Sequence, residues 1–117
     1  MTAEAVLSAD ALERLRRIGG TKLLLDMIAL YLDSGPGRIR ALLDGAEAGD
    51  ASRVERAAHS LKSSAGNLGA LRLLDAVRAL EARAADGGVD RDLVMRVVRE
   101  YDASEDALRR VLEEQGE

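Results

Sequence analysis

His59 is the only histidine in the 117-residue chain, and its neighbours suit it for chemistry. Imidazole is the side chain whose unperturbed pKa leaves a neutral, nucleophilic nitrogen near physiological pH. Lys62 stands one helical turn later and supplies a cation that could meet an anion. Ser63 and Gly66 are small and would leave room for an approaching molecule. These residues indicate either an accessible nucleophile or an ordinary surface histidine.

Helical phasing predicts which way the His59 side chain points. At about 100° per residue, the apolar residues of this segment form one stripe, made of Val54, Ala57, Ala58, Leu61, Ala65 and Leu68. His59 lies about 140° from the centre of that stripe, and Arg56, Lys62, Ser63 and Gly66 share its side. We therefore expect an exposed imidazole. A metal site is not expected, because one histidine without cysteine lacks the ligands that zinc prefers.

Composition places the chain among all-helical domains. The apolar residues are mostly Ala, Leu and Val, with two Tyr, no Phe and no Trp, and such a core favours helices over strands. The length predicts a single domain over residues 1–117. A net charge of −4 argues against a nucleic-acid partner. The chain has no apolar run of about 20 residues and no signal pattern, so we expect a cytoplasmic protein without a membrane partner.

Glycines and capping residues divide the chain into helical segments. Asp10 with Glu13 resembles a capping box, and Gly19 and Gly20 close the short helix that follows. Asp50 is placed to cap the helix that carries the histidine. The expected helices cover about 10–17, 21–48, 50–67, 70–85 and 90–113, and residues 114–117 are expected to fray.

The segment 34–37 contains the only proline, Pro36. Proline removes a backbone donor and crowds the preceding turn, so we expect a kink or a brief break there. Because the apolar phase continues across the segment, one kinked helix is favoured over two. Short connections between amphipathic helices imply antiparallel neighbours. The predicted architecture is all-α, an antiparallel up-and-down four-helix bundle with a short additional N-terminal helix.

The run Ala58–Ala70 resembles the signature of histidine-containing phosphotransfer (HPt) domains. That signature has a histidine, an apolar residue two positions on, a lysine three positions on, then small residues and a Gly-Ala ending. The segments 12–20 and 23–32, the Gly-Asp pair before the histidine helix and the Leu80–Glu81 pair also stand where the family has them. The family usually has glycine after the lysine, where this chain has Ser63, which is small enough to preserve docking.

The resemblance implies a phosphorelay carrier without a kinase activity of its own. His59 would accept a phosphoryl group on Nε2 from a receiver domain of a response regulator, Lys62 would stabilise its charge, and Glu81 would hold Nδ1–H. The expected docking residues are Ser63, Gly66, Arg56, Leu15 and Ile18. The Mg²⁺ that such transfers need would be held by the receiver, so no cofactor is expected in this chain, which we expect to be a monomer.

Other interpretations of the same residues stay open. Without the resemblance, His59 is an inert surface histidine, Lys62 and Glu81 are solvated charges, the small residues serve packing, and Leu15 and Ile18 cap the bundle. The chain could also be the phosphoacceptor module of a larger hybrid histidine kinase, or a bundle that binds receivers without chemistry. An independent kinase is excluded because no glycine-rich nucleotide motif is present. The start at Met1 without a flanking linker favours a free-standing carrier.

Overall fold

The computed structural model of the chain describes residues 6–115. These residues form the helices α1 (Ala9–Glu47), α2 (Ala51–Asn67), α3 (Leu71–Ala85) and α4 (Arg91–Gln115). The described residues contain no strand, so the predicted all-helical class is confirmed. Of the residues expected to fray, Glu114 and Gln115 belong to α4, and Gly116 and Glu117 lie outside the described residues.

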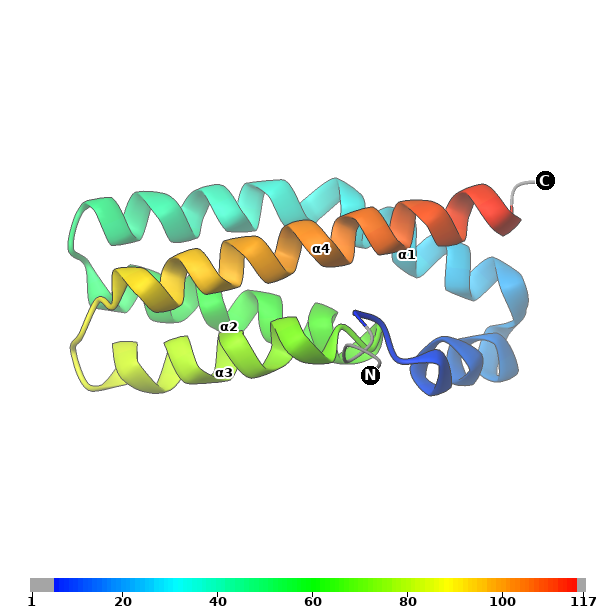
Figure 1. The fold of residues 1–117 in the computed structure, drawn as a ribbon, viewed down its shortest axis with the longest axis horizontal. Coiled ribbons are helices and arrows are strands. Elements are labelled where there is room, and N and C mark those ends of the chain that lie inside the picture. Colours follow the sequence, from blue (N-terminus) through cyan, green and yellow to red (C-terminus); the bar gives the residue numbers. More distant parts are fainter. Residues whose placement is uncertain (1–5, 116–117) are drawn as a thin grey trace, which may run out of the picture.

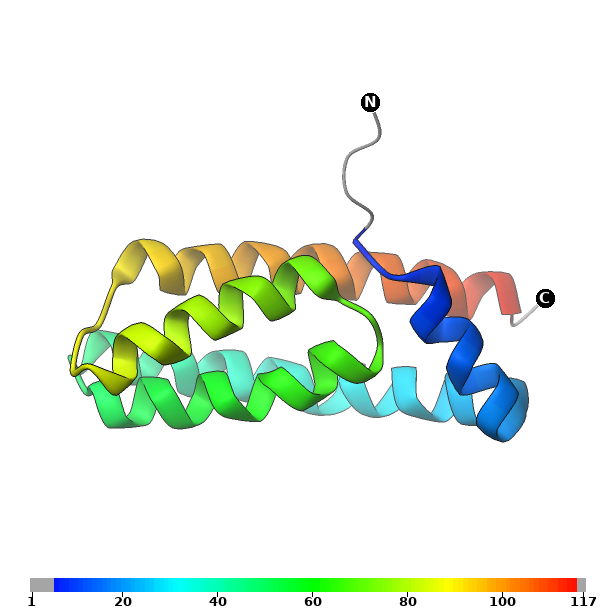
Figure 2. The same ribbon diagram turned by 90° about the horizontal axis from the view of Figure 1, so that it is seen from below.

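The helices lie side by side along one long axis (Figure 1). α1 packs against α2 and α4, and α3 packs against the same two helices. Short connections over residues 48–50, 68–70 and 86–90 join them, and successive helices run in opposite directions (Figures 1 and 2). Each helix therefore buries one face in the centre and turns the other outward.

The first helical segment changes direction at Gly19 and Gly20. Within α1, only these two residues have a non-helical backbone, and Gly20 has a φ of 74°, in a region that favours glycine. Residues 9–18 lie obliquely across one end of the bundle (Figure 2). The helix begins after Ser8, whose hydroxyl accepts a hydrogen bond from the Ala11 N–H at 3.2 Å. The predicted capping role of Asp10 is therefore wrong, because Ser8 fills that position.

The segment 34–37 stays within α1. The backbone is helical through Pro36, so the preference for one helix over two is confirmed and no break occurs. Pro36 itself is exposed, whereas its neighbour Gly35 is buried. A Cβ atom at Gly35 would overlap the ring of Tyr101, so the glycine is what allows α4 to pack this closely against α1.

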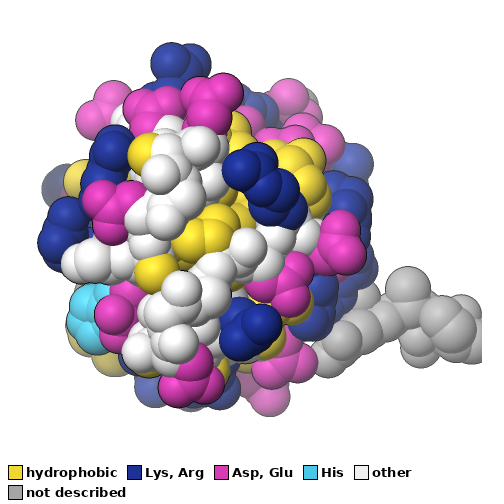
Figure 3. Space-filling view, turned by 90° about the vertical axis from the view of Figure 1, so that its left-hand side faces the viewer, with side chains coloured by type: hydrophobic (Ala, Val, Ile, Leu, Met, Phe, Trp, Pro, Cys, Tyr) yellow, Lys and Arg dark blue, Asp and Glu magenta, His cyan; other side chains and the backbone are white. Residues whose placement is uncertain are grey.

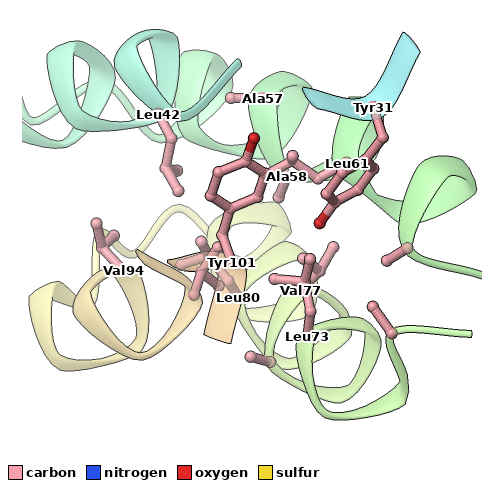
Figure 4. Packing of buried hydrophobic residues seen from close by; sticks show 14 of the residues in the cluster. Tyr31, Leu42, Ala57, Ala58, Leu61, Leu73, Val77, Leu80, Val94 and Tyr101 are labelled. Carbon is pink, nitrogen blue, oxygen red and sulfur yellow. The ribbon is translucent and has the colours of Figure 1, made fainter. Parts of the chain in front are cut away.

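Two tyrosines at the centre of the bundle join α1 to α4 (Figure 4). The rings of Tyr31 and Tyr101 stack with their centroids 5.4 Å apart. The Tyr31 hydroxyl forms a buried hydrogen bond with Ser104 Oγ at 2.6 Å, and burial raises the pKa of Tyr31 to about 12. The surrounding core is aliphatic and includes Leu24, Ile28, Leu42, Val54, Leu61, Leu73, Val77, Leu80, Val97 and Leu108. This packing fixes the rotation of α2 and α3, and with it the side chains on their outer faces.

Candidate functional site

His59 lies on the outer face of α2. Asp50 caps this helix, since its carboxylate accepts a hydrogen bond from the Arg53 N–H at 3.2 Å. Val54 and Leu61 are fully buried, whereas the His59 side chain is 69% exposed, as the phasing predicted. Figure 3 shows the imidazole (cyan) at the surface, with acidic side chains (magenta) beside it.

One carboxylate on α3 contacts both the histidine and the lysine of α2. Glu81 Oε2 lies 2.7 Å from His59 Nδ1, and Lys62 Nζ donates to Glu81 Oε1 at 2.9 Å. The hydrogen bond from Lys62, followed by that from His59, lowers the pKa of Glu81 below its ordinary value. The carboxylate is therefore charged at neutral pH, and its side chain is only 19% exposed.

The contact with Glu81 selects the tautomer of His59. A charged carboxylate can only accept a hydrogen bond, so the neutral imidazole donates through Nδ1–H. Nε2 lies on the other side of the ring and then carries the free lone pair. Because the side chain is mostly exposed, this nucleophilic nitrogen is accessible to another molecule.

Two cations stand on α2 one turn from His59, in opposite directions along the helix. Lys62, on the C-terminal side, is held by Glu81 and has a side chain that is 36% exposed. Arg56, on the N-terminal side, is exposed and donates to Ser52 Oγ at 3.2 Å. The lysine is thus bound to a charged partner, whereas the arginine contacts a neutral hydroxyl.

Most of the predicted docking residues meet at the C-terminal end of α2. Ser63 and Gly66 are exposed there. Ile18 is 69% exposed, Leu15 is half-buried against the core, and both line a depression that includes Gly66. Arg56 lies apart from this group, beyond His59 toward the start of α2.

Two apolar residues of α1 extend the same surface and were missed by the sequence analysis. Met27 and Leu30 line a second depression with Ser63 and Asn67, and Leu30 is 59% exposed. The position of Leu30 outside the buried stripe of its own helix is a signal that the sequence contains. Its place next to α2 depends on how the two helices pack, which the sequence of one helix does not show.

The described residues hold no group of three or more acidic, histidine or cysteine side chains that could bind a metal ion. Nor does any helix in this part of the chain have the length and apolar character needed to cross a membrane. The site consists of an imidazole, the Glu81 carboxylate and two nearby cations. A nucleophilic nitrogen beside positive charge suits the acceptance of an anionic electrophile such as a phosphoryl group.

Two solved structures share this fold. One is histidine-containing phosphotransfer protein B (HptB) from Pseudomonas aeruginosa PAO1, with a TM-score of 0.87 and 23% identity over 96% of this chain and 98% of that one. The other is the HPT domain of a sensor hybrid histidine kinase from Shewanella, with a TM-score of 0.82 and 18% identity over 93% of this chain and 95% of that one. No curated protein sequence matches the chain.

The family follows from the sequence match. A family model described as the Hpt domain matches residues 26–113. The matched region contains all of α2 and α3, and so it includes His59, Lys62 and Glu81. The resemblance drawn from the Ala58–Ala70 run is confirmed: the chain belongs to the Hpt domain family and is a histidine phosphotransfer module.

Proposed function

We propose that this chain is a phosphorelay carrier. His59 accepts a phosphoryl group from the phosphorylated aspartate of one receiver domain and passes it to the aspartate of another. The observation that carries the proposal is the 2.7 Å contact between His59 Nδ1 and Glu81 Oε2, which leaves Nε2 of an exposed imidazole as the free nucleophile. Membership of the Hpt family supports the class of reaction.

The first transfer forms one N–P bond and breaks one P–O bond. The Nε2 lone pair attacks the phosphorus of the aspartyl phosphate in line with the leaving oxygen, and the aspartate departs as a carboxylate with the electron pair of that bond. The Nδ1 proton stays on the ring, where the Glu81 carboxylate offsets the positive charge that the imidazole gains. The second transfer is the reverse reaction with another aspartate. Positioning and charge stabilisation provide most of the catalysis in such transfers.

The role proposed for Lys62 is to stabilise the negative charge of the transferred phosphoryl group. Its ammonium has three donors, so it can keep its 2.9 Å contact with Glu81 while another N–H reaches a phosphoryl oxygen. The Mg²⁺ that the reaction needs would be bound by the acidic pocket of the receiver, and this chain would bring no cofactor. We further propose that the carrier works as a monomer in the cytoplasm.

The receiver is expected to dock on the surface that surrounds Ser63 and Gly66. The small residues at its centre allow a close approach. Of the apolar residues at its rim, Ile18 and Leu30 are exposed, and Leu15 and Met27 are half-buried. An exposed apolar patch next to a reactive side chain is typical of a protein-binding site. Docking there would place the receiver's aspartate against Nε2 of His59.

A second candidate function is the phosphoacceptor module of a larger hybrid histidine kinase. The likeness to an HPT domain from such a kinase favours it. In that case the same Nε2 nitrogen would exchange phosphoryl groups within one polypeptide or complex.

Transfer of label tests the proposal. The wild-type chain and a His59→Gln variant are mixed with a panel of ³²P-phosphorylated receiver domains. We expect label on the wild type and none on the variant, which should keep its fold because the His59 side chain is 69% exposed. A wild-type chain that takes no label from any receiver would contradict the carrier function. Label that appears only with ATP and a kinase core would favour the second candidate.

A further inference from the structure

We propose that Arg56 is a second cation that contacts the phosphoryl group on Nε2 of His59, and so takes part in the transfer step. This inference rests on the proposed function and assigns one more residue to the same site.

The position of the imidazole points toward Arg56. Side chains on an α-helix lean toward its N-terminus and cover the preceding turn. For His59 that turn carries Glu55 and Arg56, and a shallow depression lined by Glu55, Arg56, His59 and Glu81 lies beside the ring. Because Nδ1 contacts Glu81, Nε2 is the ring nitrogen left to carry a phosphoryl group beside this depression. A phosphoryl group on Nε2 would therefore lie within reach of the Arg56 guanidinium.

Lys62 and Arg56 differ in the charge of the group that each contacts. Lys62 donates to the Glu81 carboxylate at 2.9 Å, and part of its charge is already offset there. The guanidinium of Arg56 donates to the neutral Ser52 hydroxyl at 3.2 Å, and among residues 6–115 no carboxylate pairs with it. Exchange of the hydroxyl for a phosphoryl oxygen would replace a hydrogen bond to a neutral acceptor with one to a charged acceptor.

The acidic side chains around the depression would repel a phosphoryl group unless a cation lay nearby. Two carboxylates, Glu55 and Glu81, line it, and Lys62 offsets only the second of them. A phosphoryl group brings further negative charge and would meet Glu55 as a like charge. Arg56, on the same turn, offsets that repulsion. The guanidinium is also a planar donor that suits phosphate oxygens.

Phosphoramidate separates contact with the phosphoryl group from docking, because it transfers phosphoryl to histidine without any receiver. The Nε2 lone pair attacks its phosphorus, the P–N bond breaks and ammonia leaves. Phosphohistidine formation is followed on the wild type, Arg56→Gln, Arg56→Lys, Glu55→Gln and the matched control Arg53→Gln. The control removes an exposed arginine from the same helix. The Arg56 Nε–H resonance is recorded before and after phosphorylation.

We expect Arg56→Gln to slow phosphorylation by about two- to fivefold, the range of an exposed ion pair. Arg56→Lys should recover part of the rate, Glu55→Gln should raise it, and Arg53→Gln should match the wild type. The difference in rate between the wild type and Arg56→Gln should narrow as salt is added. Phosphorylation should also shift the Arg56 Nε–H resonance.

Equal rates for Arg56→Gln and Arg53→Gln, with an unmoved Arg56 resonance, would overturn the inference and leave the carrier function intact. A wild-type chain that forms no phosphohistidine with phosphoramidate or with any receiver would overturn both. Slower transfer from a receiver together with an unchanged phosphoramidate rate would assign Arg56 to docking alone, against the inference.

Discussion

Glu81 offers the sharpest test of how the site prepares its nucleophile. Replacing it with alanine removes the acceptor at 2.7 Å from His59 Nδ1 and releases Lys62 as well. The imidazole is then free to move its proton to Nε2, and that tautomer has no lone pair at the reacting position. We expect Glu81→Ala to slow phosphorylation of His59 without unfolding the bundle.

The size of the effect follows from the exposure of the contact. A hydrogen bond to a charged group contributes about 1.5–3 kcal/mol when it is well shielded, and an exposed ion pair contributes about 0.2–1 kcal/mol. The His59 side chain is 69% exposed and that of Glu81 only 19%, so we place the contact near 1 kcal/mol, at the upper end of the exposed range. That energy changes the tautomer ratio about fivefold. Because the rate scales with the population of the competent form, we expect it to fall about two- to fivefold.

Two measurements follow this change. Two-bond ¹H–¹⁵N correlation spectra report which ring nitrogen carries the proton, and phosphoramidate gives the phosphorylation rate without a receiver. Glu81→Gln should keep more of the Nδ1–H tautomer than Glu81→Ala, because its amide oxygen can still accept the proton. Asp75→Ala removes another exposed carboxylate from α3 and serves as the control. If Glu81→Ala keeps both the Nδ1–H tautomer and the wild-type rate, Glu81 does not position His59.

Four further outcomes are expected. Lys62→Ala should slow phosphotransfer about two- to fivefold with an unchanged circular dichroism spectrum; loss of the helical signal would contradict its surface position. Ser63→Arg should block transfer from a receiver and leave phosphoramidate labelling intact, and unaffected transfer would refute the docking surface. Gly35→Ala should lower the free energy of unfolding by about 1–3 kcal/mol, since its Cβ overlaps Tyr101; urea denaturation measures this, and a neutral result would contradict the packing. Because the folded-state pKa of Glu81 is lowered from 4.5, its contribution to stability is complete above pH 4.5 and is lost as the pH falls through the folded value. The stability difference between wild type and Glu81→Gln should therefore shrink as the pH falls below 4.5, and a constant difference would argue against the ion pair.

Local signals in the sequence predicted the elements of the fold well. The break at Gly19 and Gly20 was predicted because paired glycines end a helix. Gly20 has a positive φ, which explains why a glycine stands at this position. The continuity of α1 through Pro36 followed from the phase of its apolar residues. The predicted start of α1 was wrong because two candidate capping residues, Ser8 and Asp10, lie close together in the sequence. Only the packed structure shows that Ser8 makes the capping hydrogen bond.

The candidate site was predictable only where it depends on a single helix. The outward direction of His59 follows from the period of α2 alone. The contact of Glu81 with both His59 and Lys62 joins two helices, and the sequence suggested only the histidine contact, through the family resemblance. The exposed Leu30 beside Ser63 depends on how α1 packs against α2, which no periodicity within one helix specifies.

In the proposed function, Nε2 of His59 receives the phosphoryl group. A ¹H–³¹P correlation spectrum, recorded at neutral pH after transfer from a phosphorylated receiver, shows which ring nitrogen carries the phosphoryl group. Nε2 is bonded to both Cδ2 and Cε1, so the phosphorus should couple to Hδ2 and Hε1 of His59. Coupling to Hε1 alone would place the phosphoryl group on Nδ1, and a phosphorus signal that persists in His59→Gln would place it on another residue. Either result would rule out Nε2 of His59 as the phosphoryl acceptor.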